Sequence, residues 1–246
     1  MQRTDTLSCG YKIIQDDKAF CFGIDAVLLS AFTRLRKGDR VFDLGCGNGI
    51  LELLLCKKSQ SLKSSHNVQD CKFTGLEIQP AAVSMARKSV CLNSLENQIE
   101  IVQGDIKNIR NLFSAQCADV VVSNPPYMLP FAAKANSTDE KTIARHEVLC
   151  SLDDVTGAAK WLLKSNGSFF MIHRPYRLSE IFSALEKYNL TPRQLQLVYP
   201  KIDLPPEMVL IEARPNYKPD LKIAPPLIMY GSDGEYTPEF KAYCGM

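Results

Sequence analysis

Strands and helices alternate along most of this chain, and this alternation constrains its fold more than any other feature. From Arg40 onward, short apolar runs such as RVFDLG, KFTGLEI, IEIVQGD and ADVVVSN are separated by glycine turns and by stretches with helical spacing. Strands that are apolar on both faces are typical of a parallel sheet covered by helices on both sides. Right-handed crossovers then bring the carboxyl ends of these strands to one edge, where ligands bind in such sheets.

The rest of the chain predicts one reversed strand and two flanking segments. RQLQLVYP and EMVLIEARP are joined only by KIDLPP, a connection short enough for an antiparallel hairpin. We therefore predict an α/β, Rossmann-like fold with a mainly parallel seven-stranded sheet, one antiparallel strand and helices on both faces. Residues 1–39 are expected to form a lid-like hairpin with an Asp-Asp turn, followed by a helix capped by Asp25 and ending near Gly38. Residues 40–215 form the main domain, and residues 216–246 form a tail packed on it. The polar stretch from Lys57 to Lys72 predicts a surface loop.

Composition narrows the class of protein but not its partner. With 246 residues, 46% hydrophobic and 23% charged, the chain can bury a large core, and its formal net charge of +2 neither favours nor excludes a polyanion. The nine cysteines lie scattered in apolar runs without paired CxxC spacing, which indicates reduced thiols and no metal site. Because the N-terminus lacks a signal-peptide core and no apolar run could span a bilayer, we expect a cytoplasmic protein without membrane contact.

A glycine-rich loop, DLGCGNG, follows the first strand of this alternation and precedes a helix. Glycines at this place allow a tight turn and let a ligand approach the backbone closely. The spacing is GxGxG rather than the GxGxxG of dinucleotide binders, and Asp43 would place a carboxylate where a pyrophosphate should bind. A cationic ligand therefore fits the loop better, and a nicotinamide oxidoreductase is disfavoured.

Two further acids follow the next two strands. Glu77 ends GLE and Asp105 follows QG, so both are expected at the ligand-binding edge. A carboxylate at the first position can accept both hydroxyls of a ribose, and one at the second can accept from the exocyclic amine of an adenine. Together with the glycine loop they predict a pocket for an adenosine that carries a positive centre and no phosphates, which describes S-adenosylmethionine.

The tetrapeptide NPPY, residues 124–127, follows the fourth strand at the same edge. Prolines fix the turn and remove amide donors, so its carbonyls are left as acceptors, and Asn124 adds a side-chain oxygen. Two acceptors held close together suit a planar amino group, and Tyr127 offers a flat face for stacking. The turn is therefore predicted to grip and orient the amine that is methylated.

These motifs resemble the class I S-adenosylmethionine-dependent methyltransferases over Arg40 to Pro215, with DxGxGxG matched by Asp43, Gly45, Gly47 and Gly49. The resemblance implies cofactor contacts from Asp43, Gly45, Cys46, Gly47, Gly49, Glu77, Ile78, Asp105, Ile106 and Asn124. NPPY resembles the signature of amino-methyltransferases, which act on adenine or on glutamine, and implies Asn124, Pro125, Pro126 and Tyr127 as the catalytic residues. FCFGIDAVLLSAF, ARHE, HRPYRLSEI and PPLIMYGSDGEYT are similar to the bacterial tRNA1(Val) adenine-N6 methyltransferase family over nearly the whole chain.

That resemblance implies N6 methylation of adenine 37, beside the anticodon of tRNA1(Val), by an enzyme that we expect to be a monomer. An unstacked base in an anticodon loop enters a pocket at low cost. Basic candidates for phosphate contact are Lys134, Lys141, Arg145, His146, Arg174, Arg177, Arg34, Arg36 and Lys37. Three alternatives remain open at this point: methylation of a protein glutamine, methylation of adenine in rRNA or DNA, and an RNA-binding protein without catalytic activity.

Overall fold

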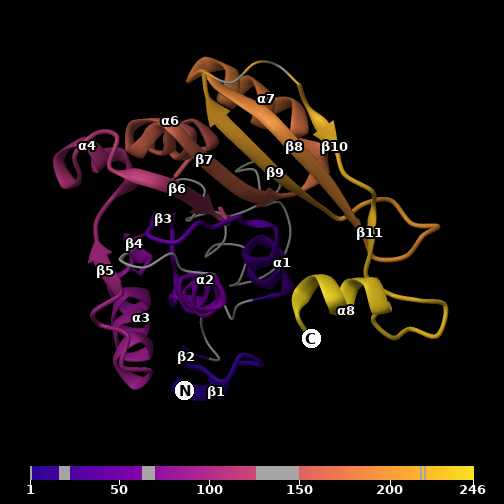
Figure 1. Cartoon of the computed structure of the whole chain (residues 1–246), viewed down its shortest axis with the longest axis horizontal. Coiled ribbons are helices and arrows are strands. Elements are labelled where there is room, and N and C mark those ends of the chain that lie inside the picture. The colour runs from indigo at the N-terminus through magenta and orange to yellow at the C-terminus, as the bar shows by residue number, and fades with distance from the viewer. Residues whose placement is uncertain (1, 17–22, 63–69, 126–149, 217, 219) are drawn as a thin grey trace, which may run out of the picture.

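The fold is a single large sheet with helices on both faces (Figure 1). The computed structural model describes residues 2–16, 23–62, 70–125, 150–216, 218 and 220–246. Its main strands are β3 (Arg40–Leu44), β4 (Lys72–Glu77), β5 (Ile99–Gln103), β6 (Ala118–Ser123), β7 (Leu163–His173), β8 (Leu190–Tyr199) and β9 (Met208–Pro215). Two short strands from the tail are β10 (Lys222–Ile223) and β11 (Leu227–Ile228).

The order of the strands in the sheet is β10-β8-β9-β7-β6-β3-β4-β5, and β11 also pairs with β8. All of these pairings are parallel except those of β9, which runs antiparallel to both β7 and β8. The predicted mainly parallel sheet with one reversed strand is therefore confirmed, whereas the two short strands of the tail give it nine strands among the described residues instead of seven. Because β3 to β7 run in the same direction, their carboxyl ends lie along one edge of the sheet.

The helices divide between two hydrophobic clusters, one on each face of the sheet. The first face is covered by α1 (Ile24–Phe32), α2 (Ile50–Gln60), α3 (Pro80–Leu92) and α8 (Pro238–Cys244). The second is covered by α4 (Ile109–Leu112), α6 (Leu152–Leu162) and α7 (Leu178–Lys187), with single turns η1 (Ile106–Asn108) and η2 (Pro175–Arg177) beside them. Alternation along β3 sends Val41 to the first face and Phe42 and Leu44 to the second, as a strand period of two requires.

The N-terminal hairpin forms, but from other residues than predicted. Strand β1 (Gln2–Thr6) pairs with β2 (Lys12–Asp16) through a turn in which Gly10 has φ 88°. The predicted Asp-Asp turn begins at Asp16, which ends β2, and Asp17 lies outside the described residues, so that turn stays a prediction. The positive φ at Gly10 explains where the chain reverses, since glycine adopts that conformation without steric cost. The hairpin lies against α3, where the amide of Ile14 donates to Ser89 Oγ at 2.9 Å.

Two other predictions for flanking segments need correction. Helix α1 has Gly23 at its N-cap with no side-chain cap bond and ends at Phe32, so Asp25 lies in its first turn and Gly38 lies beyond it. The polar stretch from Lys57 is not loop throughout, because α2 continues to Gln60. Lys58 Nζ explains the extension: it donates to three carbonyls, those of Ser30, Ala31 and Thr33, at 2.7–2.8 Å. This ammonium group closes the carboxyl end of α1.

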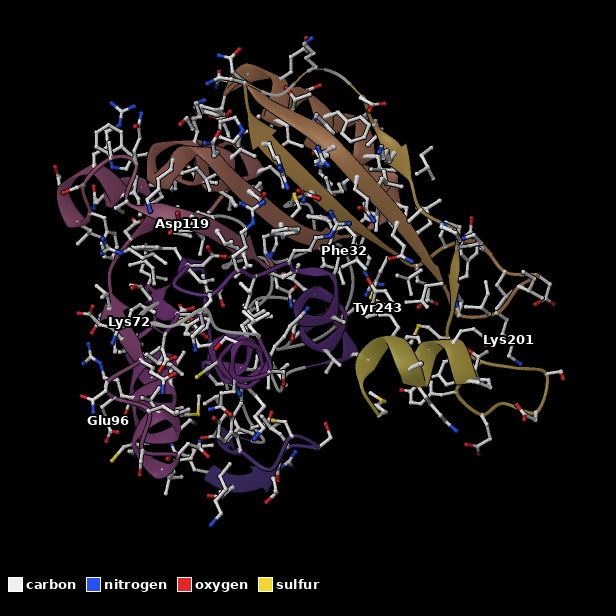
Figure 2. The ribbon with its side chains drawn as sticks, in the orientation of Figure 1. Phe32, Lys72, Glu96, Asp119, Lys201 and Tyr243 are labelled. Atoms are coloured by element: carbon white, nitrogen blue, oxygen red, sulfur yellow. The ribbon has the colours of Figure 1, made fainter. Side chains whose placement is uncertain are left out.

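The tail returns to the sheet and to α1. Strands β10 and β11 extend the sheet beside β8, and α8 lies against α1. Tyr243 belongs to α8 (Figure 2), and its hydroxyl donates to Oε1 of Gln196 on β8 at 2.9 Å. Tyr236 stacks between Tyr230 and Phe240, with ring centroids 4.9 and 4.8 Å apart. The tail is thus held by strand pairing and by aromatic packing.

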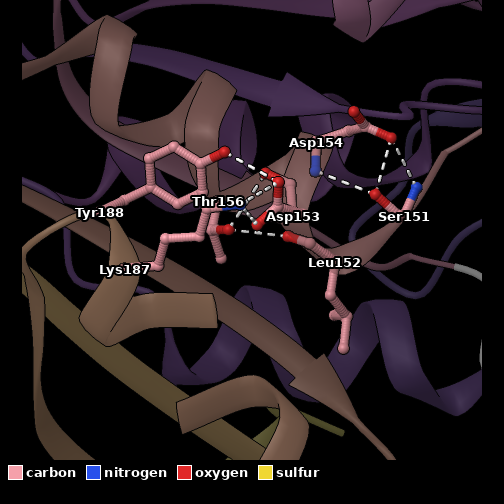
Figure 3. Close-up of polar contacts among 7 residues, drawn as sticks. All are labelled: Ser151, Leu152, Asp153, Asp154, Thr156, Lys187 and Tyr188. Atoms are coloured by element: carbon pink, nitrogen blue, oxygen red, sulfur yellow. Dashed lines mark hydrogen bonds and ion pairs between the residues drawn. The ribbon is translucent and has the colours of Figure 1, made fainter. Parts of the chain in front are cut away.

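Polar contacts fix α6 and α7 to each other on the second face (Figure 3). Helix α6 begins with a capping box in which Ser151 and Asp154 exchange hydrogen bonds between side chain and backbone. Asp153 accepts from Lys187 Nζ at 2.8 and 2.9 Å and from the hydroxyl of Tyr188 at 2.9 Å. These contacts hold the amino end of α6 against the carboxyl end of α7.

Candidate functional site

The strand ends β5, β4, β3 and β6 are neighbours in the sheet, and the predicted site residues lie there together. Asp43 is the fourth residue of β3 and Glu77 is the last residue of β4. Asp105 follows β5 and caps η1, and Asn124 directly follows β6. Four segments that are far apart in sequence thus meet at one edge because their strands are parallel.

The glycine loop turns sharply between β3 and α2. Gly45, Gly47 and Gly49 have φ values of 83°, 56° and 85°, which side chains with a Cβ rarely adopt. A Cβ on Gly49, the N-cap of α2, would also lie 3.2 Å from the Cβ of Ala86 in α3. The amides of Gly45 and Cys46 donate to the Leu76 carbonyl at 2.9 and 3.1 Å, which ties the loop to β4.

Glu77 links the loop to the end of its own strand. Its Oε2 accepts from the amide of Gly47 at 3.0 Å and its Oε1 from the amide of Gln79 at 2.9 Å. The residue is 6% exposed, so these bonds hold the carboxylate in one orientation. Each oxygen keeps a second lone pair, so the group can still accept from the hydroxyls of a ribose. Ile78 follows directly and is half-buried.

Asp105 lies at the next strand end and is half-buried, as is Ile106 after it. Its side chain accepts from the amide of Lys107 at 2.9 Å, which starts η1. The amide of Gly104 donates to the Glu77 carbonyl at 3.0 Å and joins this loop to the end of β4. Asp105 and Glu77 therefore stand on connected backbone beside the glycine loop.

Polar atoms without partners are concentrated beneath the glycine loop. Among the described residues, no hydrogen bond reaches either carboxyl oxygen of Asp43 or Glu52, or Nδ2 of Asn48. Leaving such groups unsatisfied in a folded protein costs about 1–3 kcal/mol each, and more for a charged one. A ligand that brings positive charge and hydrogen-bond partners would relieve that cost, so the residues present fit a cationic cofactor.

Burial and like charge both act on these acids. Burial, followed by the charges of Glu52 and Glu77, raises the pKa of Asp43 well above its usual range. Burial raises the pKa of Glu52 to about 8, and the charge of Glu77 adds to the effect. Burial likewise raises the pKa of the Cys46 thiol, which argues against a role as nucleophile. The site therefore gathers three acidic side chains, those of Asp43, Glu52 and Glu77, and favours a positively charged ligand.

Glu52 is the residue that sequence reasoning missed. It lies in the first turn of α2 and is 2% exposed. A signal was present, because an acid in the middle of the apolar run ILELLL should lie on an exposed face unless something holds it inside. The helical period alone does not show which face of α2 meets the sheet.

The asparagine–proline turn begins at the neighbouring strand end. Ser123, the last residue of β6, is buried, and its hydroxyl donates to the Leu44 carbonyl at 2.8 Å, which joins the ends of β6 and β3. Asn124 is half-buried and Pro125 is buried. Pro126 and Tyr127 lie outside the described residues. Asn124 therefore stands one strand away from the glycine loop, as the order of the strands requires.

The basic candidates for phosphate contact differ widely in environment. Arg177 is 5% exposed and its guanidinium pairs with Glu180 at 2.8 Å, which argues against contact with a nucleic acid. Lys37 pairs with Asp70, and Arg34 contacts Glu212 and Gln194. Arg174 donates to the Glu207 carbonyl at 3.1 Å, and Arg36 is exposed. Lys134, Lys141, Arg145 and His146 lie outside the described residues.

The described residues contain neither a membrane-spanning helix nor a metal-binding cluster. Over these ranges no helix is long and apolar enough to cross a membrane. The same part of the chain brings together no group of three or more histidine, cysteine, aspartate or glutamate side chains that could hold a metal ion.

The sheet order, the glycine loop and the three acids at adjacent strand ends define a class I S-adenosylmethionine-dependent methyltransferase, and S-adenosylmethionine is the cofactor of that class. Comparison with known proteins agrees. Residues 35–214 match the methyltransferase domain family, and the chain belongs to this family.

Similar proteins cover almost the whole chain. A protein of Haemophilus influenzae named tRNA1(Val) (adenine(37)-N6)-methyltransferase is 25% identical over 242 residues, which cover 94% of this chain and 92% of the relative. A protein of the same name from Porphyromonas gingivalis is 28% identical over 242 residues, covering 94% and 89%. The crystal structure of a predicted O-methyltransferase from Agrobacterium tumefaciens has a TM-score of 0.70 at 20% identity and covers 90% of this chain and 95% of its own.

Proposed function

We propose that this protein transfers a methyl group from S-adenosylmethionine to the exocyclic N6 amine of an adenine in tRNA, adenine 37 beside the anticodon of tRNA1(Val). The observation that carries the proposal is the position of Asn124 and Pro125, directly after β6 and one strand away from the glycine loop. The names of the relatives, which match over 94% of this chain, support the choice of base and of tRNA.

The glycine loop and the strand-end acids would hold the cofactor. Asp43 and Asn48 offer buried polar atoms for its methionine part, Glu77 accepts from the ribose hydroxyls, and Asp105 with Ile106 borders the adenine. Gly45, Cys46, Gly47, Gly49 and Ile78 complete the set of proposed contacts. When bound, S-adenosylmethionine supplies an electrophilic methyl group on a sulfonium.

The asparagine–proline turn would position the amine. The side-chain oxygen of Asn124 and the carbonyl of Pro125 accept the two N–H bonds of the planar amino group and so aim its nitrogen. Because the lone pair of this nitrogen is delocalised into the ring, acceptors that draw electron density onto nitrogen as the N–C bond forms stabilise the transition state. Pro126 and Tyr127 are proposed to fix the turn and to stack on the base.

An unstacked base in the anticodon loop suits this site, since extruding it breaks few interactions. We further propose that the enzyme acts as a monomer in the cytoplasm. The segments 1–39, 40–215 and 216–246 are proposed as the substrate-side element, the catalytic domain and the packed tail.

The test is transfer of labelled methyl from S-adenosylmethionine to total tRNA from a strain that lacks this gene, followed by nucleoside analysis. The wild-type protein should produce N6-methyladenosine, and Asn124→Ala should reduce the rate by about 10²–10³, by analogy with the loss of one preorganised hydrogen-bond partner. Asn97→Ala is the matched control, because Asn97 is exposed and precedes the amino end of β5, at the edge of the sheet opposite the site.

Other outcomes would overturn the proposal in identifiable ways. Labelled methyl in a protein fraction, with tRNA unlabelled, would indicate a glutamine substrate. Labelling of rRNA or DNA adenine alone would retain the chemistry and change the nucleic acid. Absence of methyl transfer to any of these acceptors would point to a protein that binds without catalysis.

A further inference from the structure

The carboxyl groups of Asp43 and Glu52 face the same small volume beneath the glycine loop. Asp43 on β3 and Gly75 on β4 are register partners, so their Cβ directions point to the same face of the sheet. A Cβ placed on Gly75 would overlap Glu52 Oε1 and would lie 2.8 Å from Cys46 Sγ. The Glu52 carboxyl therefore occupies the space that a side chain at position 75 would take, next to Asp43.

Neither carboxyl group reaches solvent or a hydrogen-bond partner. Asp43 and Glu52 are each 2% exposed, and their four oxygens have no partner among the described residues. An acid that is buried and unpartnered is stable only when it is neutral or when a ligand supplies the missing charge. The pair of Asp43 and Glu52 is therefore stable either in a protonated form or beside a cationic ligand.

Among the described residues, the ionisable groups that face Glu52 are all acidic. Asp43 approaches from β3, Cys46 from the glycine loop and Glu77 from the end of β4. Burial is the largest cause that raises the pKa values of Asp43, Cys46 and Glu52, and the charge of Glu77 adds to the rise in each of them. Glu77 differs because its carboxylate accepts hydrogen bonds from two backbone amides. Two adjacent buried carboxyls titrate as one unit, so the proton belongs to the pair rather than to either residue.

We propose that Asp43 and Glu52 share a proton when the glycine loop is empty, and that binding of a cationic ligand releases this proton to solvent. The O–H bond of the protonated carboxyl breaks, the electron pair stays on the oxygen as a carboxylate, and the positive charge of the ligand replaces that of the proton. Glu52 acts as a positioning residue that adjusts the charge of the site to its ligand. This inference rests on the proposed function, because it takes S-adenosylmethionine as the ligand.

The product of methyl transfer carries less positive charge than the cofactor. Methyl transfer turns the sulfonium into a neutral thioether, so S-adenosylhomocysteine brings one positive charge less to the Asp43 and Glu52 carboxyls. The pair should then retain more of its proton. Product binding should accordingly release fewer protons than cofactor binding does.

Calorimetric titration of the full chain with S-adenosylmethionine in buffers of different ionisation enthalpy tests the proposal without any methyl acceptor. The dependence of binding heat on buffer ionisation enthalpy reports the number of protons released. We expect about one proton for the wild type near neutral pH and a clearly smaller number with S-adenosylhomocysteine. The dissociation constant for S-adenosylmethionine should fall by up to about tenfold per pH unit as pH rises through neutrality.

Glu52→Gln should release clearly fewer protons than the wild type, since its amide cannot titrate and can donate a hydrogen bond to an ionised Asp43 carboxyl. Glu52→Leu is a second variant, and Glu100→Gln, at an exposed position on β5, is the matched control and should match the wild type. Tight binding by the wild type without proton release, or unchanged release by both Glu52 variants, would overturn this inference and leave the proposed function intact. Absence of any binding heat with the wild type would overturn both.

Discussion

Replacing Glu212 with glutamine tests how strongly one buried carboxylate organises the basic side chains around it. Glu212 lies on β9 and its side chain is fully buried. Its Oε1 lies 2.7 Å from Arg214 Nε and 3.8 Å from Arg193 Nε, and its Oε2 lies 3.3 Å from Arg34 Nη1. Ser168 Oγ donates to the same carboxylate at 3.3 Å. One negative charge therefore serves three guanidinium groups.

The expected cost follows from the burial of the partners. Exposed ion pairs contribute only about 0.2–1 kcal/mol, whereas removing one partner of a buried pair costs about 3–5 kcal/mol because a charge is left uncompensated. The Arg34 side chain is 55% exposed and those of Arg193 and Arg214 are 24% and 23% exposed, so all three can turn partly toward water. We therefore expect Glu212→Gln to lower the free energy of unfolding by about 3 kcal/mol, the lower end of the range for a buried pair.

Urea and thermal unfolding followed by circular dichroism would measure the loss. For a chain of this length, about 3 kcal/mol corresponds to a fall in Tm of roughly 6–12 °C. Glu186→Gln, at an exposed position on α7, should stay within about 0.5 kcal/mol of the wild type. If Glu212→Gln lost less than about 1 kcal/mol, the value of an exposed pair, the argument from a buried carboxylate would be wrong.

Three further changes test packing, ionisation and helix capping. Gly75→Ala should lower the free energy of unfolding by about 1–3 kcal/mol through overpacking against Glu52 and Cys46, and an unchanged urea midpoint would show that the Glu52 side chain moves aside freely. The pKa of Glu52 is raised from 4.5 to about 8, so the native state holds the Glu52 proton more tightly than the unfolded chain does. The contribution of this group to the free energy of unfolding is fully present below pH 4.5 and is lost as the pH rises to about 8. At about 1.4 kcal/mol per pKa unit the loss amounts to at most about 5 kcal/mol. Glu52→Gln should weaken this dependence, because only the buried Asp43 carboxyl of the pair then remains to titrate, and urea titrations at pH 5 and pH 8.5 that differ equally for both proteins would contradict it. Ser151→Ala removes a side chain that accepts from the Asp154 amide at 3.2 Å and should cost about 1 kcal/mol, which differential scanning calorimetry can detect; an unchanged Tm would mean that the cap adds nothing to α6.

Local patterns in the sequence predicted most of the fold. Strands and helices were predictable because apolar runs and helical spacing depend only on residues close together in the sequence. One example is the predicted helical stripe of Ala82, Met85, Ala86 and Ser89, all of which are buried on α3. The edge at which Asp43, Glu77, Asp105 and Asn124 meet was also predictable, since parallel strands with right-handed crossovers leave no other arrangement.

Tertiary structure alone decided the charge environment and several boundaries. Glu52 is held beneath the glycine loop by the absence of a side chain at Gly75, a contact between α2 and β4 that no local pattern records. Lys58 extends α2 because its ammonium group donates to carbonyls at the end of α1. Glu212 forms ion pairs with Arg34 and Arg193, which come from other segments of the chain. Periodicity is a property of adjacent residues, but desolvation and Coulomb interactions depend on which distant residues share a volume. The sequence by itself therefore determined the fold and the place of the site, and packing decided how its acids are charged.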